Sequence, residues 1–263
     1  MYIVDFPWYD FENIEPHINK FWEVLRLQLR EAGFEDKLLP SSPCRDIHFS
    51  EQWSAPNLLI SQACGFDVVT TFKEKLQLLA APSFSIDGLK NGHYFSYLVT
   101  HECNESNELI DFKGKKLAIN SHQSHSGMNI FRCVMKSAMK DFNFNENLLI
   151  SGAHIKSLEL IRSKKADLAA IDGVTYHLLE RHDPDKLRNT RVIRKTPAVT
   201  SCPYITRRNL PEEELEMLKA ALFATFAEPS LNETLDHLLL KGVNQVTLAD
   251  YKSIEKMNAK YGT

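Results

Sequence analysis

The chain has 263 residues, of which 43% are hydrophobic and 25% charged, a composition typical of globular proteins and not of disordered or fibrous ones. Its 31 basic and 34 acidic residues give a net charge of −3, so the basic excess of general nucleic-acid binders is missing. The five cysteines are scattered and form no Cys-x-x-Cys pair. Neither structural zinc nor thioredoxin-like chemistry is therefore indicated, and free thiols are expected.

The first residues, Met1 to Tyr9, show no basic segment, apolar core or cleavage site of a secretory signal. No apolar run approaches the roughly 20 residues that a membrane-spanning helix needs. The sequence as it begins at Met1 therefore predicts a cytoplasmic protein without a membrane span. A periplasmic location is expected instead if a leader naturally precedes Met1.

Short apolar runs alternate with amphipathic stretches along the chain, which predicts an α/β protein. A helix is expected to begin near Pro16 and to end at Gly33, because proline favours the first turn and glycine the end of a helix. The other predicted strands and helices follow in order. Strands are expected at 2–6, 58–61, 76–81, 94–100, 117–120, 148–151, 168–171 and 191–194, helices from about 66, at 127–139, 157–163 and 174–181, and only helices beyond Pro211.

Two places could carry the chain between two lobes, one near Tyr97–Thr100 and one near Thr196–Pro203. The second contains Pro197 and Pro203, which disfavour regular structure on both sides. This organisation predicts a first lobe of residues 1–98 plus 202–263 and a second lobe of residues 99–201.

The most informative segment runs from Leu117 to Arg132, where a strand leads into a hydroxyl-rich loop and a helix begins at Ser126-Gly127. Ser124 and Ser126 offer hydroxyl donors, and Gly127 has no side chain to block close approach. The first amides of a helix lack intrahelical partners, and the helix dipole favours negative charge there. The segment therefore predicts a site for a small oxyanion, although Ser126 alone could simply cap the helix.

Two further polar residues follow predicted strands: His154 comes after the strand at 148–151, and Asp172 ends the strand at 168–171. In open α/β sheets, ligands bind outside the carboxyl ends of the strands. Each residue alone could be a turn or cap residue, but together with Ser126 they predict a shared cleft.

Other chemistries are less well supported by the same residues. A Ser-His-Asp hydrolase would need a glycine where Ser124 stands, and the chain order of the three residues differs from that fold. His122 and His125 could ligate a metal, but solvated histidines are expected in a loop. Cys64 could be a reactive thiol, but a buried small residue is expected. No catalytic residue, metal or cofactor is therefore predicted.

Several segments together resemble the phosphate, phosphite and phosphonate branch of the substrate-binding proteins of ABC importers. The similarity begins at the opening Asp5-Phe-Pro-Trp-Tyr-Asp and recurs in order from about residue 58 to residue 206. Its segments are Leu58-Leu-Ile-Ser-Gln-Ala-Cys-Gly-Phe, Gly92-His-Tyr-Phe-Ser-Tyr-Leu-Val, Asp111-Phe-Lys-Gly-Lys-Lys-Leu-Ala-Ile-Asn, Ser124-His-Ser-Gly-Met-Asn, Gly152-Ala-His-Ile-Lys-Ser-Leu, Ala166-Asp-Leu-Ala-Ala-Ile-Asp and Thr196-Pro-Ala-Val-Thr-Ser-Cys-Pro-Tyr.

The resemblance implies the type II periplasmic-binding-protein fold, in which two lobes, each a mixed, mostly parallel sheet flanked by helices, close on a ligand around a two-strand hinge. It implies that Ser124, Ser126 and Gly127 form an oxyanion loop, that His154 contacts the anion and that Asp172 lies across the cleft. The resemblance extends to four further candidate ligand-binding positions. Tyr94 and Ser96 match a Tyr-x-Ser on the strand before the hinge, Tyr9 matches an aromatic that closes over the ligand, and Gln62 matches a loop position for which ligand contact is our inference.

The function that the resemblance implies is a monomeric solute-binding protein that clamps phosphate, phosphite or a phosphonate, for uptake with an ABC permease or for cytosolic sensing. A carboxylate such as Asp172 favours a ligand that offers a proton and disfavours sulfate, because a buried unpaired acceptor costs roughly 1–3 kcal/mol. Two alternatives stay open: an enzyme on the same fold acting on a small metabolite or cofactor precursor, and a protein-interaction module with a vestigial cleft.

Overall fold

The computed structural model describes residues 1–262, and the chain divides into two compact units. Unit 1 comprises Met1–His93 and Thr200–Asp250, and unit 2 comprises Tyr94–Val199 and the chain from Tyr251 onward. The chain thus passes between the units three times. The first two passages lie in the short strands β4 (His93–Tyr94) and β10 (Val199–Thr200), which pair with each other.

Unit 1 is built on a five-stranded sheet with the order β1-β2-β11-β3-β12. Its strands are β1 (Ile3–Val4), β2 (Leu58–Gln62), β3 (Leu76–Phe84), β11 (Tyr204–Arg207) and β12 (Leu240–Asn244). The β1–β2 pair is parallel, whereas β11 runs antiparallel to β2 and β3, and β12 antiparallel to β3. The sheet is mixed, as expected, but antiparallel pairing dominates it, so the expectation of a mostly parallel sheet was wrong for this unit.

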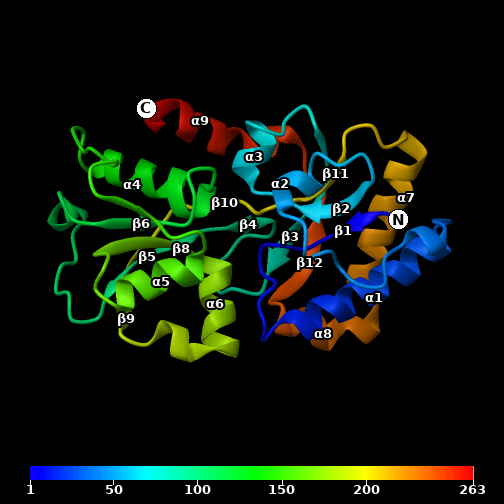
Figure 1. Ribbon diagram of the computed structural model, residues 1–263, viewed down its shortest axis with the longest axis horizontal. Helices are drawn as coiled ribbons and strands as arrows, with labels where there is room; N and C mark the ends of the chain where they lie inside the picture. The colour runs from blue at the N-terminus through cyan, green and yellow to red at the C-terminus, as the bar shows by residue number, and fades with distance from the viewer. Residues whose placement is uncertain (263) are drawn as a thin grey trace. The chain divides into compact units, whose positions relative to one another are not determined.

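The longest helix of unit 1, α1 (Glu15–Glu31), shows why the sequence forms it. Pro16 lies in its first turn, and its apolar residues at three- and four-residue spacing are buried. Gly33 has a φ of +105°, and the Phe34 amide returns to the Leu29 carbonyl, which ends the helix. The other helices are α2 (Phe49–Gln52), α3 (Gly65–Val69), α7 (Glu212–Ala227), which packs on α1, and α8 (Asn232–His237) (Figure 1).

Unit 2 has its own five-stranded sheet with the order β7-β6-β8-β5-β9. Its strands are β5 (Ser96–His101), β6 (Leu117–Ile119), β7 (Leu148–Ile150), β8 (Leu168–Asp172) and β9 (Thr190–Lys195). Strand β6 pairs in parallel with β7 and β8, and β5 pairs antiparallel with β8 and β9. The carboxyl ends of the three parallel strands therefore meet at one edge of the sheet.

The helices of unit 2 are α4 (Ile130–Ala138), α5 (His154–Arg162), α6 (Gly173–His182) and α9 (Lys252–Tyr261), and a π-helical turn (His125–Asn129) precedes α4. Phe131 and Met135 of α4 are fully buried and belong to the same hydrophobic cluster as Leu117 and Ile119 of β6. Short 3-10 turns in the two units cover Asp36–Leu38, Leu109–Phe112, Pro184–Leu187, Pro229–Leu231 and Leu248–Tyr251.

The C-terminal helix differs from the expected lobe division, which assigned residues 202–263 to the first lobe. In the structure α9 belongs to unit 2, where it packs on α4 (Figure 1). Arg132 of α4 donates hydrogen bonds to the Asn258 side chain and the Gly262 carbonyl, each at 3.1 Å. The first passage between units also lies a few residues before the expected one. Sequence composition could not reveal the hydrogen bonds between α4 and α9, because they join residues more than 120 positions apart.

Other elements also differ from expectation. Strands β11 and β12 were not predicted, and β12 interrupts the region beyond Pro211 that was expected to be only helical. The expected strand 94–100 is broken at Phe95, and α5 begins at His154, three residues before the predicted start. Among residues 1–262, no helix is long and apolar enough to cross a membrane.

Candidate functional site

The loop after β6, residues 121–127, is called the serine loop here. Ser124 caps the π-helical turn: its Oγ accepts a hydrogen bond from the Gly127 amide at 3.0 Å, and its carbonyl accepts one from the Asn129 amide at 3.0 Å. π-Helical turns are rare and frequently occur at functional sites. The Gly127 amide is thus satisfied by the cap, while the backbone dipole at the start of the turn favours an anion there.

Ser126 lies at the centre of this arrangement. Its Oγ is 2.9 Å from Nε2 of His154 and 3.4 Å from Oγ of Ser124. Ser96, buried on β5, donates from its hydroxyl to the Ser126 carbonyl at 2.9 Å. The predicted residues Ser124, Ser126 and His154 are therefore adjacent, and the structure shows Ser96 fixing the backbone of the loop.

His154 is the first residue of α5 and faces strand β8. Burial lowers the pKa of its imidazole to about 4, against a smaller opposing effect of its hydrogen bond to the Ala170 carbonyl. The ring is therefore neutral at neutral pH. The donor between Ser126 and His154 depends on the ring tautomer: with the proton on the nitrogen that faces the Ala170 carbonyl, Nε2 accepts from the Ser126 hydroxyl, and with Nδ1 accepting from the Asp172 amide, Nε2 donates to that hydroxyl. The stronger donation expected of protonated His154 is thus available only at acidic pH.

Asp172 is buried at the end of β8 and caps α6. Its Oδ1 accepts hydrogen bonds from the amides of Val174 at 2.8 Å and Thr175 at 3.0 Å. Asp172 is paired with Ser96 in the sheet, and its amide is 3.5 Å from Nδ1 of His154. The structure therefore brings Asp172 to the same sheet edge as the serine loop and gives it a capping role. Its contact with ligand stays a prediction.

Asn120, which sequence reasoning missed, lies directly against Gly127. A Cβ added to Gly127 would stand 1.9 Å from Oδ1 of Asn120 and 3.2 Å from Cε1 of His154. Within residues 1–262, this Oδ1 is buried and no hydrogen-bond partner is found for it. The close approach of the Asn120 side chain thus requires a residue without a Cβ at position 127. The available signal for Asn120 was its place as the first polar residue after β6.

His125 is buried and not solvated, so the expectation of a solvated histidine was wrong at this position, whereas His122 is exposed as expected. Nδ1 of His125 is 3.1 Å from Nδ2 of Asn129, and this Nδ2 also donates to the Ile254 carbonyl of α9 at 3.3 Å. Burial lowers the pKa of His125 to about 3, so the ring stays neutral. Among the described residues no cluster of three or more metal-ligating side chains exists.

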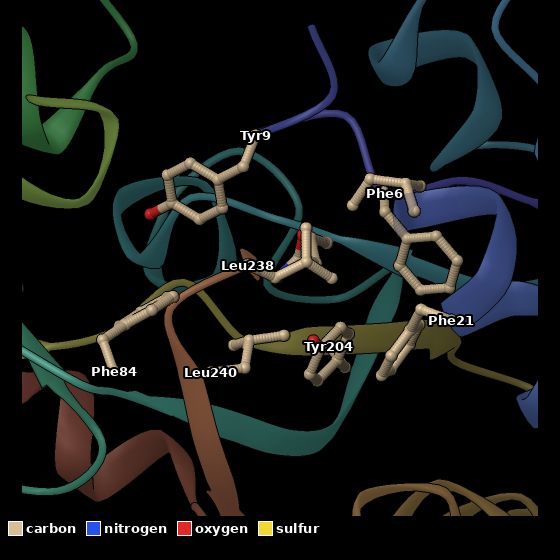
Figure 2. Close-up of a pocket in the computed structure, with 9 residues that line it drawn as sticks. Phe6, Tyr9, Phe21, Phe84, Tyr204, Leu238 and Leu240 are labelled. Atoms are coloured by element: carbon tan, nitrogen blue, oxygen red, sulfur yellow. The ribbon is translucent and has the colours of Figure 1, made fainter. Parts of the chain in front are cut away.

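Three further residues were predicted to bind the ligand, and they are distributed over both units. Tyr94 is fully buried in unit 2, with its ring 6.2 Å from that of His125. Tyr9 and Gln62 belong to unit 1, where both line a small cavity (Figure 2). Cys64 is buried, forms no disulfide and precedes α3, in agreement with the expected small buried residue.

Comparison with known families gives one match over most of the chain. The family described as the phosphonate periplasmic substrate-binding protein of ABC transporters matches residues 60–251. A search of curated proteins finds no match.

Comparison with solved structures finds similar folds over nearly the whole chain. PhnD1 of Prochlorococcus marinus in complex with methylphosphonate has a TM-score of 0.79 and 17% identity, covering 100% of this chain and 98% of that one. A binding-protein component of an ABC phosphonate transporter from Pseudomonas aeruginosa has a TM-score of 0.76 and 15% identity, covering 100% and 86%. XAC2383 of Xanthomonas citri bound to ATP has a TM-score of 0.72 and 12% identity, covering 99% and 96%. At these identities the structures show a shared fold, that of the type II periplasmic binding proteins.

Proposed function

The chain belongs to the family of phosphonate periplasmic substrate-binding proteins of ABC transporters, and we propose that its serine loop binds a phosphorus oxyanion: phosphate, phosphite or a phosphonate. A solute-binding role follows from the family. The observation that supports the ligand class is the 2.9 Å contact between Ser126 and His154 at the start of a π-helical turn. There, the hydroxyl groups of Ser124 and Ser126 lie together at the start of a helical turn, where the backbone dipole favours a small anion.

The proton arrangement favours a ligand that still carries a proton. Ser124 accepts from the Gly127 amide, so its own hydroxyl proton is available for the anion. In the tautomer of neutral His154 whose proton is on Nδ1, Nε2 is an acceptor for the ligand once Ser126 turns its own proton to it, and in either tautomer Asp172 is an acceptor at the same sheet edge. A singly protonated phosphonate or phosphate can donate to such acceptors. Sulfate cannot at neutral pH, and an unpaired buried acceptor costs roughly 1–3 kcal/mol.

The same contact favours a second candidate, an enzyme in which His154 activates Ser126 as a nucleophile. The hydroxyl lies at hydrogen-bond distance from the imidazole, as in such pairs. However, the other side of the imidazole faces backbone groups of β8, and Oδ1 of Asp172 caps α6. Phosphorus-31 NMR of a phosphate ester incubated with the protein distinguishes the two: a new resonance indicates turnover, whereas unchanged ester supports binding alone.

As to cellular role, we propose uptake together with an ABC permease, with the periplasm as the place of action. The family's own description supports both. Sensing of the same ligand is the alternative that a cytosolic location would favour. Expression of the native gene with fractionation of the cells separates these roles.

Isothermal titration calorimetry with phosphate, phosphite, methylphosphonate and sulfate tests the ligand class. We expect binding of at least one phosphorus oxyanion and none of sulfate. Ser126→Ala should weaken binding about 10- to 100-fold, since a hydrogen bond to a charged group contributes roughly 1.5–3 kcal/mol. Ser163→Ala, at an exposed hydroxyl at the end of α5, is the matched control and should bind like the native protein. Equal binding of sulfate, or native-like affinity of Ser126→Ala, would refute the proposal.

A further inference from the structure

Two of the five cysteines, Cys64 and Cys202, are buried in unit 1, where 7% and 6% of their surfaces are exposed. Both are thiols in the structure. Cys64 follows the end of β2 and directly precedes α3, whereas Cys202 lies between β10 and β11. The two segments are far apart in the sequence, but β2 and β11 are neighbours in the sheet of unit 1. The sheet therefore brings the two cysteines into one place.

The register between β2 and β11 sets these two cysteines opposite each other. The strands are antiparallel, and their pairing places Tyr204 opposite Gln62. The same register continues one residue further, because the Ala63 amide donates a hydrogen bond to the Pro203 carbonyl at 3.1 Å. Pro203 has no amide proton to return, which ends the regular ladder at this point. One more step in the same register pairs the two cysteines with each other.

The expected spacing of this pair suits a disulfide. In antiparallel sheets, hydrogen-bonded pairs alternate with pairs that share no hydrogen bond, and the Cα atoms of the second kind are only about 4.5 Å apart. Ala63 and Pro203 form a hydrogen-bonded pair, so Cys64 and Cys202 are a pair of the closer kind. The backbone of Cys64 is extended, with φ −66° and ψ 138°, as the continued strand requires. A disulfide bridges Cα atoms roughly 4.4–6.8 Å apart.

The two cysteine side chains also belong to one face of the sheet. Gln62 and Tyr204 both line the small cavity of unit 1 (Figure 2), so these paired residues share a face. Side chains alternate between the two faces along a strand. Cys64 comes two residues after Gln62, and Cys202 comes two residues before Tyr204. The alternation therefore directs both thiols to the face on which Gln62 and Tyr204 lie.

We propose that Cys64 and Cys202 form a reversible cross-strand disulfide when the chain meets a disulfide oxidant, such as oxidised glutathione or an oxidised dithiol enzyme. One cysteine thiolate attacks the oxidant's disulfide to give a mixed disulfide, and the second cysteine then displaces the remaining sulfur. The two thiols lose two protons and two electrons, and the oxidant is reduced to two thiols. The proposed periplasmic place of action supplies such oxidants. The inference concerns unit 1 alone and does not depend on the oxyanion function of the serine loop.

The disulfide would fasten the beginning of β11 to the end of β2. Cys202 is the second residue after β10, so the bond would anchor the chain to the sheet of unit 1 directly after the second passage between units. It would also close a long loop of chain, which restricts the unfolded ensemble and stabilises the folded one. We expect the melting temperature of the oxidised chain to exceed that of the reduced chain by at least about 5 °C.

Refolding of the reduced, unfolded full chain in a glutathione redox buffer tests the proposal, because unfolding exposes both buried thiols to the oxidant. Thiol titration in denaturant should find two fewer thiols than the five of the reduced chain. Non-reducing peptide mass mapping should find the peptide with Cys64 joined to the peptide with Cys202. A reductant added afterwards should restore the thiols and the lower melting temperature. Incubation of the folded protein with the same buffer close to its melting temperature gives a second reading of the same cross-link.

Variants assign the cross-link to this pair. Cys64→Ala and Cys202→Ala should each abolish both the joined peptides and the rise in melting temperature. Cys44→Ala, at a half-buried cysteine of the same unit, is the matched control and should keep both.

Three results would overturn the inference. They are recovery of both thiols after refolding, linkage of Cys64 or Cys202 to a different cysteine, and a cross-link that leaves the melting temperature unchanged or lowers it. The last result would mean that the bond distorts the sheet and that the two thiols do not face each other in the native register. None of the three affects the oxyanion function, which the calorimetric titrations measure separately.

Discussion

The hydroxyl oxygen of Ser126 lies 2.9 Å from Nε2 of His154, although 28 residues separate them in sequence. The two come from neighbouring parallel strands, since Ser126 follows β6 and His154 follows β7. Because β6 and β7 run in the same direction, the segments after them emerge at the same edge of the sheet. This contact joins a hydroxyl group to a neutral imidazole, so the protonation state of His154 is the central electrostatic property of the serine loop.

His154 should not titrate near neutral pH. Burial lowers its pKa to about 4 from an ordinary value of 6.5, so the unfolded chain takes up a proton that the folded chain rejects between these values. The contribution of neutral His154 to the stability of the fold is therefore complete above about pH 6.5. It is lost progressively as the pH decreases toward 4. Ring nitrogen-15 NMR of His154 from pH 4.5 to 8 checks this. A midpoint near 6.5 for His154 would contradict it.

Gly127→Ala should displace Asn120 and weaken phosphonate binding. The new methyl group would stand 1.9 Å from Oδ1 of Asn120, and such overpacking costs roughly 1–3 kcal/mol. Because the obstruction is one side chain, the double variant with Asn120→Ala should recover most of the lost thermal stability. A double-mutant cycle by calorimetry and thermal melting measures the coupling. Additive effects of the two substitutions would show that Asn120 is not the obstacle.

The C-terminal helix should influence the serine loop through α4. Asn258→Ala removes an acceptor of the buried Arg132 guanidinium, and an unmet buried donor costs roughly 1–3 kcal/mol. We expect lower thermal stability together with weaker methylphosphonate binding, because Asn129, one turn before Arg132, holds α9 through the Ile254 carbonyl. Glu255→Ala, exposed on the same helix, is the control. Reduced stability with unchanged affinity would show that α9 supports the fold but does not position the loop.

Asp67 should make the protein less stable at alkaline pH. It is buried in α3, and burial raises its pKa to about 7 from 3.8. The folded chain therefore retains a proton that the unfolded chain releases, so the contribution of this group to stability decreases as the pH rises from about 4 to 7.

The corresponding variant, Asp67→Asn, should raise the melting temperature at pH 8 by at least about 3 °C, since roughly 1 kcal/mol moves it about 2–4 °C in a domain of this size. At pH 4 to 5 the variant should differ little from the native protein. Asp87→Asn, at an exposed carboxylate of the same unit, should show no such pH dependence. An equal shift at both pH values would mean that the charge of Asp67 is not responsible.

Local patterns predicted the elements whose cause is local. The apolar spacing from Ile18 to Leu29 with Gly33 beyond it predicted α1, and the start of a helix after two serines predicted the serine loop. The rule that ligands lie at the carboxyl ends of strands was sufficient to group Ser126, His154 and Asp172 at one sheet edge. Such features depend on a few neighbouring residues, so their signal is present in any short window of the sequence.

Only the tertiary structure decided which partners these elements found. Strand β12 pairs with β3 about 160 residues away, and the buried Arg132 binds an α9 that the sequence had assigned to the other lobe. Likewise, the neutral state of His154, the approach of Asn120 to Gly127 and the apolar cavity of unit 1 arise where distant segments exclude water together. By itself, the sequence determined the fold class and the serine loop, because these follow from local periodicity and strand ends. Burial and long-range pairing depend on the whole chain, so the electrostatics and packing around the loop became visible only in three dimensions.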